Sequence, residues 1–134
     1  MSAQTAVKKT KSKKLTVTYF KKLCDKEMSL LVRSIGHCEK CGAMEGLAHA
    51  HVIPRTNFAL RYDPINSLCL CFYCHIYWAH KNPLEFTWWF QEKYPERYEY
   101  LQHYRNQLKK RTLADWEQLL DDIRERRIEK LHYT

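Results

Sequence analysis

Two pairs of cysteines constrain the fold of this chain more than any other feature of its sequence. Cys38 and Cys41 form one Cys-x2-Cys pair, Cys71 and Cys74 form a second, and 29 residues separate the pairs. Two such pairs can present four thiolates to one Zn²⁺ ion in the tetrahedral geometry of closed structural sites. An alternative is that the thiols are buried core groups or redox-active. The paired spacing favours a structural zinc site that joins two distant segments.

The two remaining cysteines are predicted to pack in the core. Cys69 lies two residues before Cys71, so either thiol is able to serve as the ligand, but the matching gap favours Cys71 with Cys74. Cys24 falls in a helical pattern far from the cluster, where a buried thiol behaves as a small apolar side chain. No apolar signal follows the lysine-rich start of the chain. We therefore expect a reducing compartment, in which clustered cysteines bind metal more often than they form disulfides.

The charge balance points to a polyanionic partner. The chain has 134 residues, enough for one domain, with 23 Lys and Arg against 15 Asp and Glu and a formal charge of +8. Nucleic acid is the first candidate and an anionic membrane surface the second, while no apolar run is long enough to cross a membrane. Residues 1–18 contain no acidic residue. We expect a flexible tail that contacts a phosphate backbone, or simply a solvated leader, through Lys8, Lys9, Lys11, Lys13 and Lys14.

The hydrophobic pattern predicts an α+β fold. Strands are expected over residues 47–53 and 67–71, and helices over 19–35, from 76 to 80, 84–94, 96–109 and from 112 onwards. Gly36 suits the end of the first helix, and Thr112 with Asp115 resembles a capping box at the start of the last one. The predicted organisation is therefore a basic tail (1–18), an N-terminal helix (19–36), a zinc-bound finger (37–83) and C-terminal helices (84–134).

Histidine and asparagine side chains lie between and beside the cysteine pairs. His49 and His51 are two residues apart on a predicted strand and so share one face. Asn66 precedes the second strand, and His75 directly follows Cys74. A single histidine on a strand is usually structural. Imidazole is nevertheless suited both to a general base near pH 7 and to a metal ligand, and asparagine orients groups by hydrogen bonds, so this set is compatible with metal-assisted phosphodiester hydrolysis.

Read in order, these motifs resemble a known family. Leu47-x3-His51-Val-Ile-Pro-Arg55, then Arg61-Tyr-Asp-Pro-x-Asn66, then Leu70-Cys71-x2-Cys74-His75 resemble HNH endonucleases of the four-cysteine zinc type. The likeness covers residues 38–83, and with the preceding helix it is closest to phage NinG-type recombination proteins. It implies a ββα-metal finger packed against the N-terminal helix and a C-terminal helical array. It also implies DNA as substrate and a catalytic Mg²⁺ or Mn²⁺ ion beside the structural zinc.

The resemblance assigns roles to individual residues. His51 matches the general base that activates water, Asn66 the residue that holds the loop and base in register, and His75 a ligand of the catalytic metal. Many HNH enzymes have a second ligand directly before the base, where this chain has Ala50. His49, on the same strand face as His51, is the expected substitute.

Arginine and aromatic side chains surround the motifs. Arg55 and Arg61 match family arginines and are expected to bind DNA phosphates, or alternatively to make structural hydrogen bonds. His80 lies five positions after His75, about 140° further round an α-helix, which favours a surface role. Helical spacing predicts that the C-terminal aromatic residues pack in the core rather than stack on bases, namely Phe86, Trp88, Trp89, Phe90, Tyr94, Tyr98, Tyr100 and Tyr104.

Together these inferences predict a metal-dependent endonuclease that cleaves double-stranded or branched DNA in phage recombination. The alternatives are a non-catalytic zinc-finger nucleic-acid-binding protein and a phage packaging accessory. One finger holds one active site, so cutting both strands would need a homodimer or two successive events. A phage-encoded protein of this kind would act in the cytoplasm of a bacterial host.

Overall fold

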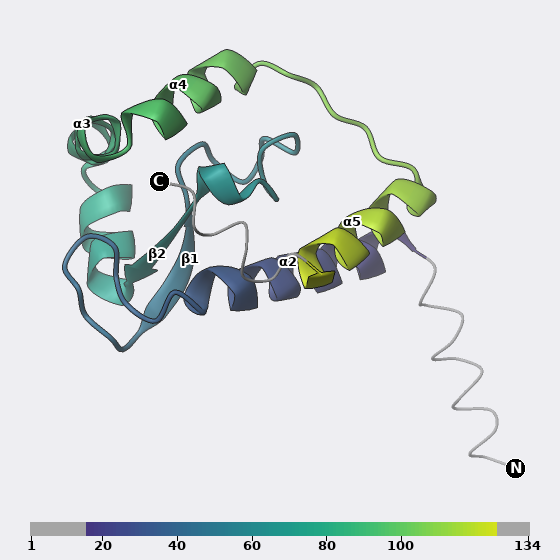
Figure 1. Cartoon of the computed structure of the whole chain (residues 1–134), viewed down its shortest axis with the longest axis horizontal. Coiled ribbons are helices and arrows are strands. Elements are labelled where there is room, and N and C mark those ends of the chain that lie inside the picture. Colours follow the sequence, from purple (N-terminus) through teal and green to yellow (C-terminus); the bar gives the residue numbers. More distant parts are fainter. Residues whose placement is uncertain (1–15, 126–134) are drawn as a thin grey trace, which may run out of the picture.

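The computed structural model describes residues 16–125 and is a mixed α+β fold (Figure 1). A 3₁₀ turn, Pro64–Asn66, precedes the second strand, and a π-helix, Tyr73–His80, follows it. The longer elements are α2 (Val17–Arg33), β1 (Leu47–His51), β2 (Ser67–Cys71), α3 (Pro83–Lys93), α4 (Pro95–Tyr104) and α5 (Leu113–Glu125). The five lysines of the predicted basic tail and residues 126–134 lie outside the described residues. No described helix has both the length and the apolar character needed to cross a membrane.

Helix α2 begins two residues earlier than the hydrophobic pattern predicts because Thr16 caps it. The Thr16 hydroxyl accepts a hydrogen bond from the Tyr19 N–H at 3.1 Å. Gly36 adopts a positive φ of 86° just beyond the helix, a conformation that glycine adopts without strain. Cys24 is fully buried on this helix, and burial, with the nearby Asp25 charge, raises its pKa to about 11. The prediction that Cys24 is a core residue is confirmed.

The sheet consists of two antiparallel strands whose register sets the two faces. His49 pairs with Cys69 and His51 with Ser67, so these side chains share the face toward α2. The other face, with Leu68 and Leu70, lies in a core with α3 and α4. Strand β1 ends two residues before the predicted Ile53. The N–H of Val52 still donates to the carbonyl of Asn66 in the register of the strands. The ladder stops there because the N–H of Ile53 bonds to the Asn66 side chain instead.

Two hydrophobic clusters flank the sheet. Helices α2 and α5 lie side by side on one side of it, and α3 and α4 lie on the other (Figure 1). The capping box of α5 is confirmed, since Thr112 and Asp115 exchange hydrogen bonds of 2.9 and 3.2 Å. Helix α4 is shorter than predicted and ends at Tyr104. Arg111 then anchors the following connection by donating to the carbonyl of Phe58 at 3.0 Å.

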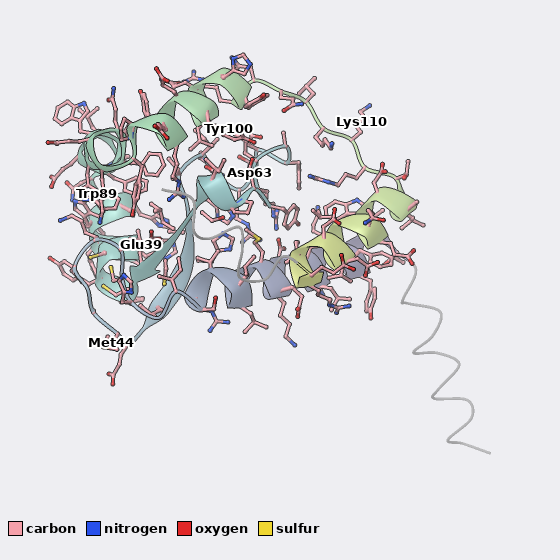
Figure 2. All side chains as sticks on the ribbon, in the orientation of Figure 1. Glu39, Met44, Asp63, Trp89, Tyr100 and Lys110 are labelled. Carbon is pink, nitrogen blue, oxygen red and sulfur yellow. The ribbon has the colours of Figure 1, made fainter. Side chains whose placement is uncertain are left out.

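Most of the C-terminal aromatic residues pack against the finger, as their helical spacing predicts. Phe86 and Phe90 are buried, whereas Trp88 and Tyr104 are exposed. Four further rings are partly buried against the same core, namely Trp89, Tyr94, Tyr98 and Tyr100. Tyr100 points toward the finger and donates a hydrogen bond to Asp63 at 2.6 Å (Figure 2). These contacts fix α3 and α4 on the finger.

A buried arginine completes this attachment. Arg97 on α4 donates to the carbonyl oxygens of Pro64, Ile65 and Ser67 at 3.3, 2.9 and 2.8 Å. Its guanidinium also lies 4.7 Å from the centre of the Tyr94 ring. The three carbonyls form the turn that leads into β2, so Arg97 holds the entrance of this strand.

Replacing this arginine should therefore destabilise the fold. We expect Arg97→Ala to lower the free energy of unfolding by about 3 kcal/mol, because buried carbonyls lose a charged donor. Urea denaturation in the presence of zinc measures the change. Arg105→Ala, at an exposed position at the end of the same helix, is the control and should cost less than about 0.5 kcal/mol. Equal losses in the two variants would contradict the role given to Arg97.

Candidate metal centre and histidine cleft

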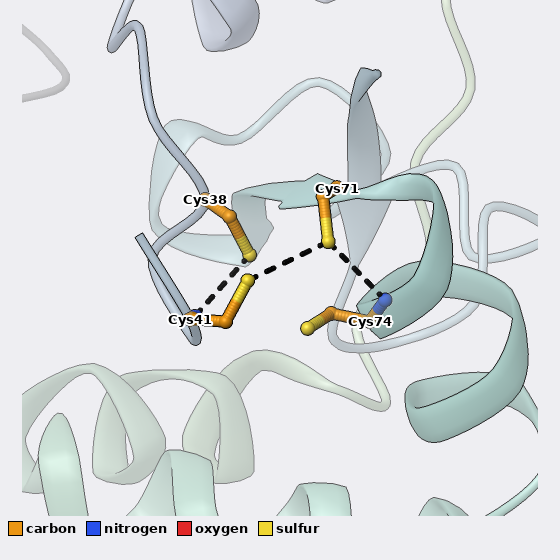
Figure 3. Close-up of side chains that lie close together, drawn as sticks. All are labelled: Cys38, Cys41, Cys71 and Cys74. Carbon is orange, nitrogen blue, oxygen red and sulfur yellow. Dashed lines mark hydrogen bonds between the residues drawn. The ribbon is translucent and has the colours of Figure 1, made fainter. Parts of the chain in front are cut away.

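The four cysteines of the two pairs converge on one point. The Sγ atoms of Cys38, Cys41, Cys71 and Cys74 all lie within 4.8 Å of one another, and those of Cys41 and Cys71 are 3.7 Å apart (Figure 3). Tetrahedral zinc with Zn–S bonds of 2.3 Å requires sulfur atoms about 3.8 Å apart. A set of four thiols at this spacing fits zinc. We call this group the cysteine centre. Cys69 is not part of it and packs in the core beside α2, as predicted.

Backbone amides prepare the cysteine centre for a cation. The N–H of Cys41 donates to the sulfur of Cys38, and the N–H of Cys74 to that of Cys71, each at 3.5 Å. Burial raises the pKa of Cys38, but backbone hydrogen bonds outweigh this effect and lower it to about 7. Burial and hydrogen bonds from the neighbouring thiols raise the pKa of Cys74. Four sulfurs this close cannot all ionise unless a cation neutralises them.

A glutamate inside the first cysteine pair ties the centre to its surroundings. The N–H of Glu39 donates to the carbonyl of Cys69, and its carboxylate accepts from the N–H of Cys69, both at 2.8 Å. The other carboxylate oxygen accepts from the Tyr94 hydroxyl at 3.0 Å, and Lys93 donates to the Glu39 carbonyl at 2.7 Å. Sequence reasoning did not identify this residue. Its only sequence signal is an acidic side chain within a Cys-x2-Cys pair.

A cleft of about 370 Å³ lies between α2 and β1. The rings of His49 and His51 are side by side in its wall, with centroids 4.2 Å apart. The cleft, which we call the histidine cleft, is also lined from α2 by Asp25, Ser29 and Arg33, and by Leu47, Ala48 and Arg55. The contribution of α2 was not predicted, because polar residues on a helix carry no signal of what they face.

His51 is held in one tautomer. Its Nε2 lies 3.1 Å from the carbonyl oxygen of Arg61, which can only accept a hydrogen bond, so Nε2 carries the proton. The Nδ1 lone pair is therefore free to accept a proton. Burial lowers the pKa of His51. The hydrogen bond to the Arg61 carbonyl raises it, whereas the positive charges of Arg55 and Arg61 lower it. The imidazole is neutral at pH 7, as a general base must be.

Asn66 holds the loop that positions His51. The side chain has no exposed surface, and its Oδ1 accepts from the N–H of Ile53 at 2.7 Å. Its Nδ2 donates to the carbonyls of Ile53 and Leu60 at 3.0 and 3.1 Å. Leu60 directly precedes Arg61, whose carbonyl fixes the His51 ring. Asn66 thus positions the His51 ring through the backbone and is not among the residues that line the cleft.

His49 has its own fixed partner. Its Nε2 donates to the Ser67 hydroxyl at 2.9 Å, because that hydroxyl uses its proton on the carbonyl of Asp63. Burial, followed by the neighbouring His51 and His75 rings, lowers the pKa of His49 to about 3. A neutral imidazole with a free Nδ1 has the chemistry of a metal ligand.

The π-helix changes the expectation for His80. An α-helix would turn residues five apart away from each other, but the wider i to i+5 spacing of a π-helix aligns them. The rings of His75 and His80 are accordingly in contact, with centroids 4.5 Å apart. His80 is exposed, as predicted, yet it lies beside His75. Burial, with the adjacent His80, lowers the pKa of His75.

The cysteine centre is the one group within residues 16–125 that brings three or more metal-ligating side chains this close together. His49 and His75 as ligands of a catalytic cation stay a prediction from the family resemblance, and of these two only His49 lines the histidine cleft. Imidazole ligands also accept Mn²⁺.

The two arginines of the loop differ in what they contact. Arg61 is buried and donates to both carboxylate oxygens of Asp25 at 3.0 and 2.7 Å. This arrangement fits the structural alternative rather than a DNA contact. Arg55 is exposed, lines the cleft and lies 3.4 Å from the same carboxylate. A DNA-binding role stays a prediction for Arg55.

Comparisons of this chain with family models, with curated proteins and with solved structures found no match.

The cysteine centre leads to a first prediction for the site. We expect one zinc ion per chain by elemental analysis, and expect Cys41→Ser or Cys74→Ser to lose the ion together with much of the thermal stability. Cys69→Ala is the matched control and should retain zinc. Loss of zinc from Cys69→Ala but not from Cys74→Ser would contradict the assignment.

A second prediction concerns Asn66. We expect Asn66→Ala to lower the free energy of unfolding by about 3 kcal/mol, because it leaves buried backbone groups unpaired. The amide proton of Ile53 should also exchange faster, which hydrogen exchange measures residue by residue. Asn82→Ala removes only a 3.4 Å bond at an exposed position and should change neither quantity. An unchanged rate of amide hydrogen exchange at Ile53 in Asn66→Ala would contradict the role of Asn66 in holding the loop.

Proposed function

We propose that this protein is a metal-dependent HNH endonuclease that hydrolyses DNA phosphodiester bonds. The observation that carries the proposal is the state of His51. Its Nε2 proton is committed to the Arg61 carbonyl, so that a neutral Nδ1 with a free lone pair remains in a cleft beside His49. A general base needs this tautomer and this protonation state. The ordered motifs that resemble HNH enzymes supply the reaction class.

In the proposed reaction, Nδ1 of His51 takes a proton from a water molecule. The resulting hydroxide attacks phosphorus, and the bond between phosphorus and the 3′ oxygen breaks. The 3′ oxygen takes a proton from solvent, which leaves a 5′-phosphate and a 3′-hydroxyl, and His51 returns its proton to solvent. A divalent cation such as Mg²⁺ or Mn²⁺, held by His75 and His49, would supply stabilisation of charge on the phosphate and on the leaving oxygen.

The charges around the histidine cleft support a phosphate ligand. Arg33 and Arg55 line the cleft, and Asp25, its one acidic lining residue, already pairs with Arg55 and Arg61. The chain as a whole carries +8, which attracts a polyanion over long distances. The role in phage recombination remains a prediction from the family resemblance.

A non-catalytic zinc-finger DNA-binding protein is the second candidate. Ala50 is the observation that favours it, because this position holds a metal ligand in many HNH enzymes and here it is buried in the core. Such a protein would need the cysteine centre and the positive charge but would not need His51.

Plasmid nicking separates the two candidates. We expect wild-type protein to convert supercoiled plasmid to nicked or linear forms in Mg²⁺ or Mn²⁺, and expect His51→Ala to be slower by at least about a hundredfold. His103→Ala, an exposed histidine on α4, is the matched control and should cut at the wild-type rate. Zinc content and circular dichroism of each variant verify that the fold is intact.

Two outcomes would count against the nuclease. Equal cutting by wild type and His51→Ala would mean that another residue or a contaminant is responsible. No cutting of plasmid or branched DNA by the zinc-loaded protein, together with salt-sensitive DNA binding, would favour the binding protein.

A further inference from the structure

Three large aromatic rings lie on the surface where the π-helix begins. Phe72 is 60% exposed, Tyr73 67% and Tyr77 47%, although core packing usually buries residues of this type. The Tyr77 ring contacts both others, with centroids 5.9 Å from Phe72 and 5.7 Å from Tyr73. We call these three residues the aromatic patch.

Neither the core nor the cysteine centre accounts for the exposure of the patch. The same helix buries Cys74 and Ala79 on its inner side, and the core aromatic residues of α3 lie against that side. An exposed group of adjoining apolar side chains usually marks a binding surface.

The charges around the patch favour a polyanion. The ammonium group of Lys81 lies 4.8 Å from the centre of the Tyr77 ring, and that of Lys40 lies 4.9 Å from the Trp78 ring. Residues 46–84 include a single acidic residue, Asp63, which is bonded to the N–H of Ile65 and to Tyr100. Glu85, just beyond this stretch, accepts a hydrogen bond from the Trp78 indole N–H at 3.1 Å. Exposed aromatic faces with a lysine on one of them, beside carboxylates that are already bonded, suit nucleic acid better than a protein surface.

We infer that the aromatic patch binds single-stranded DNA, with unpaired bases stacked on Tyr73, Tyr77 and Phe72 and with Lys81 at the phosphate backbone. Stacking needs an exposed base face, which duplex DNA does not offer. The inference rests on the proposed function and narrows its substrate. His75 lies on the same helix as the patch, so the favoured substrate is DNA that has a single-stranded segment next to the bond to be cut.

Binding measured without cleavage tests this inference. The probe is a fluorescein-labelled oligothymidylate of about 15 nucleotides, compared with a labelled duplex, by fluorescence anisotropy in buffer without added divalent cation. We expect Tyr73→Ala and Tyr77→Ala each to weaken single-strand binding about tenfold, as loss of one stacked base would. Duplex binding should change less than twofold. Trp88→Ala, an equally exposed aromatic residue on α3, is the matched control and should bind normally.

Salt dependence separates stacking from charge. Tyr73→Ala should leave the slope of log K against log salt concentration unchanged, because no phosphate contact is lost. Lys81→Ala should reduce that slope by about 0.7. A strand that contains 5-iododeoxyuridine should cross-link on irradiation to the peptide that carries Tyr73 and Tyr77.

Several results would overturn the inference. One is that Tyr73→Ala and Tyr77→Ala bind the single strand with wild-type affinity. Another is that Trp88→Ala loses as much single-strand affinity as the patch variants do. A third is that the patch variants lose as much affinity for duplex as for the single strand. A change of oligomeric state in the patch variants, with single-strand affinity unchanged, would instead assign the patch to contact with a second copy of the chain.

The two proposals fail independently. His51→Ala should lose nicking activity but bind oligothymidylate as wild type does. Wild-type protein that binds the single strand through the patch but nicks no DNA would refute the nuclease alone. Nicking that depends on His51, together with unaltered single-strand binding in the patch variants, would refute only the proposal that the patch binds single-stranded DNA.

Discussion

The cysteine centre is the interaction on which the other parts of the structure depend. A two-stranded sheet is only marginally stable by itself, and here the two strands are joined by a long loop rather than a tight turn. A cation at the centre would link the segment before β1 to the end of β2 and the start of the π-helix. Glu39 extends that link by bonding to Cys69 and Tyr94, so that the metal centre, β2 and α3 form one connected unit. Metal binding and folding of the finger should therefore be coupled.

The loop between the strands is ordered by side chains from both flanking layers. Asn66 holds it from inside, Arg97 holds its exit from α4, and Asp25 on α2 holds Arg61. Arg61 therefore acts at two places: its side chain anchors the loop to α2, while its carbonyl fixes the tautomer of His51. The histidine cleft is thus a product of the loop and of α2 as well as of the strand that carries the imidazoles.

The parts that sequence reasoning predicted correctly are those with a strict local period or spacing. Two Cys-x2-Cys pairs identified the cysteine centre, the hydrophobic pattern located β2 at its observed ends, and Thr112 with Asp115 located the start of α5. Failures came where tertiary contacts override local pattern. The π-helix has no sequence period of its own, so the contact between His75 and His80 was not foreseen. The environment of Arg61 depended on Asp25, 36 residues earlier, which no spacing rule connects.

The π-helix also explains why the candidate catalytic and binding features lie so close together. It begins beside Cys71 and contains Cys74, so the cysteine centre sets its position relative to the sheet. Its wide turn brings together residues five apart, His75 with His80 and Phe72 with Tyr77. A regular α-helix would rotate the members of each of these pairs about 140° away from each other. A single element, fixed at one end by the cysteine centre, thus carries both His75 and the surface proposed to bind the unpaired strand. Loss of a cation from the cysteine centre should therefore change the positions of both His75 and the aromatic patch, although neither includes a cysteine ligand.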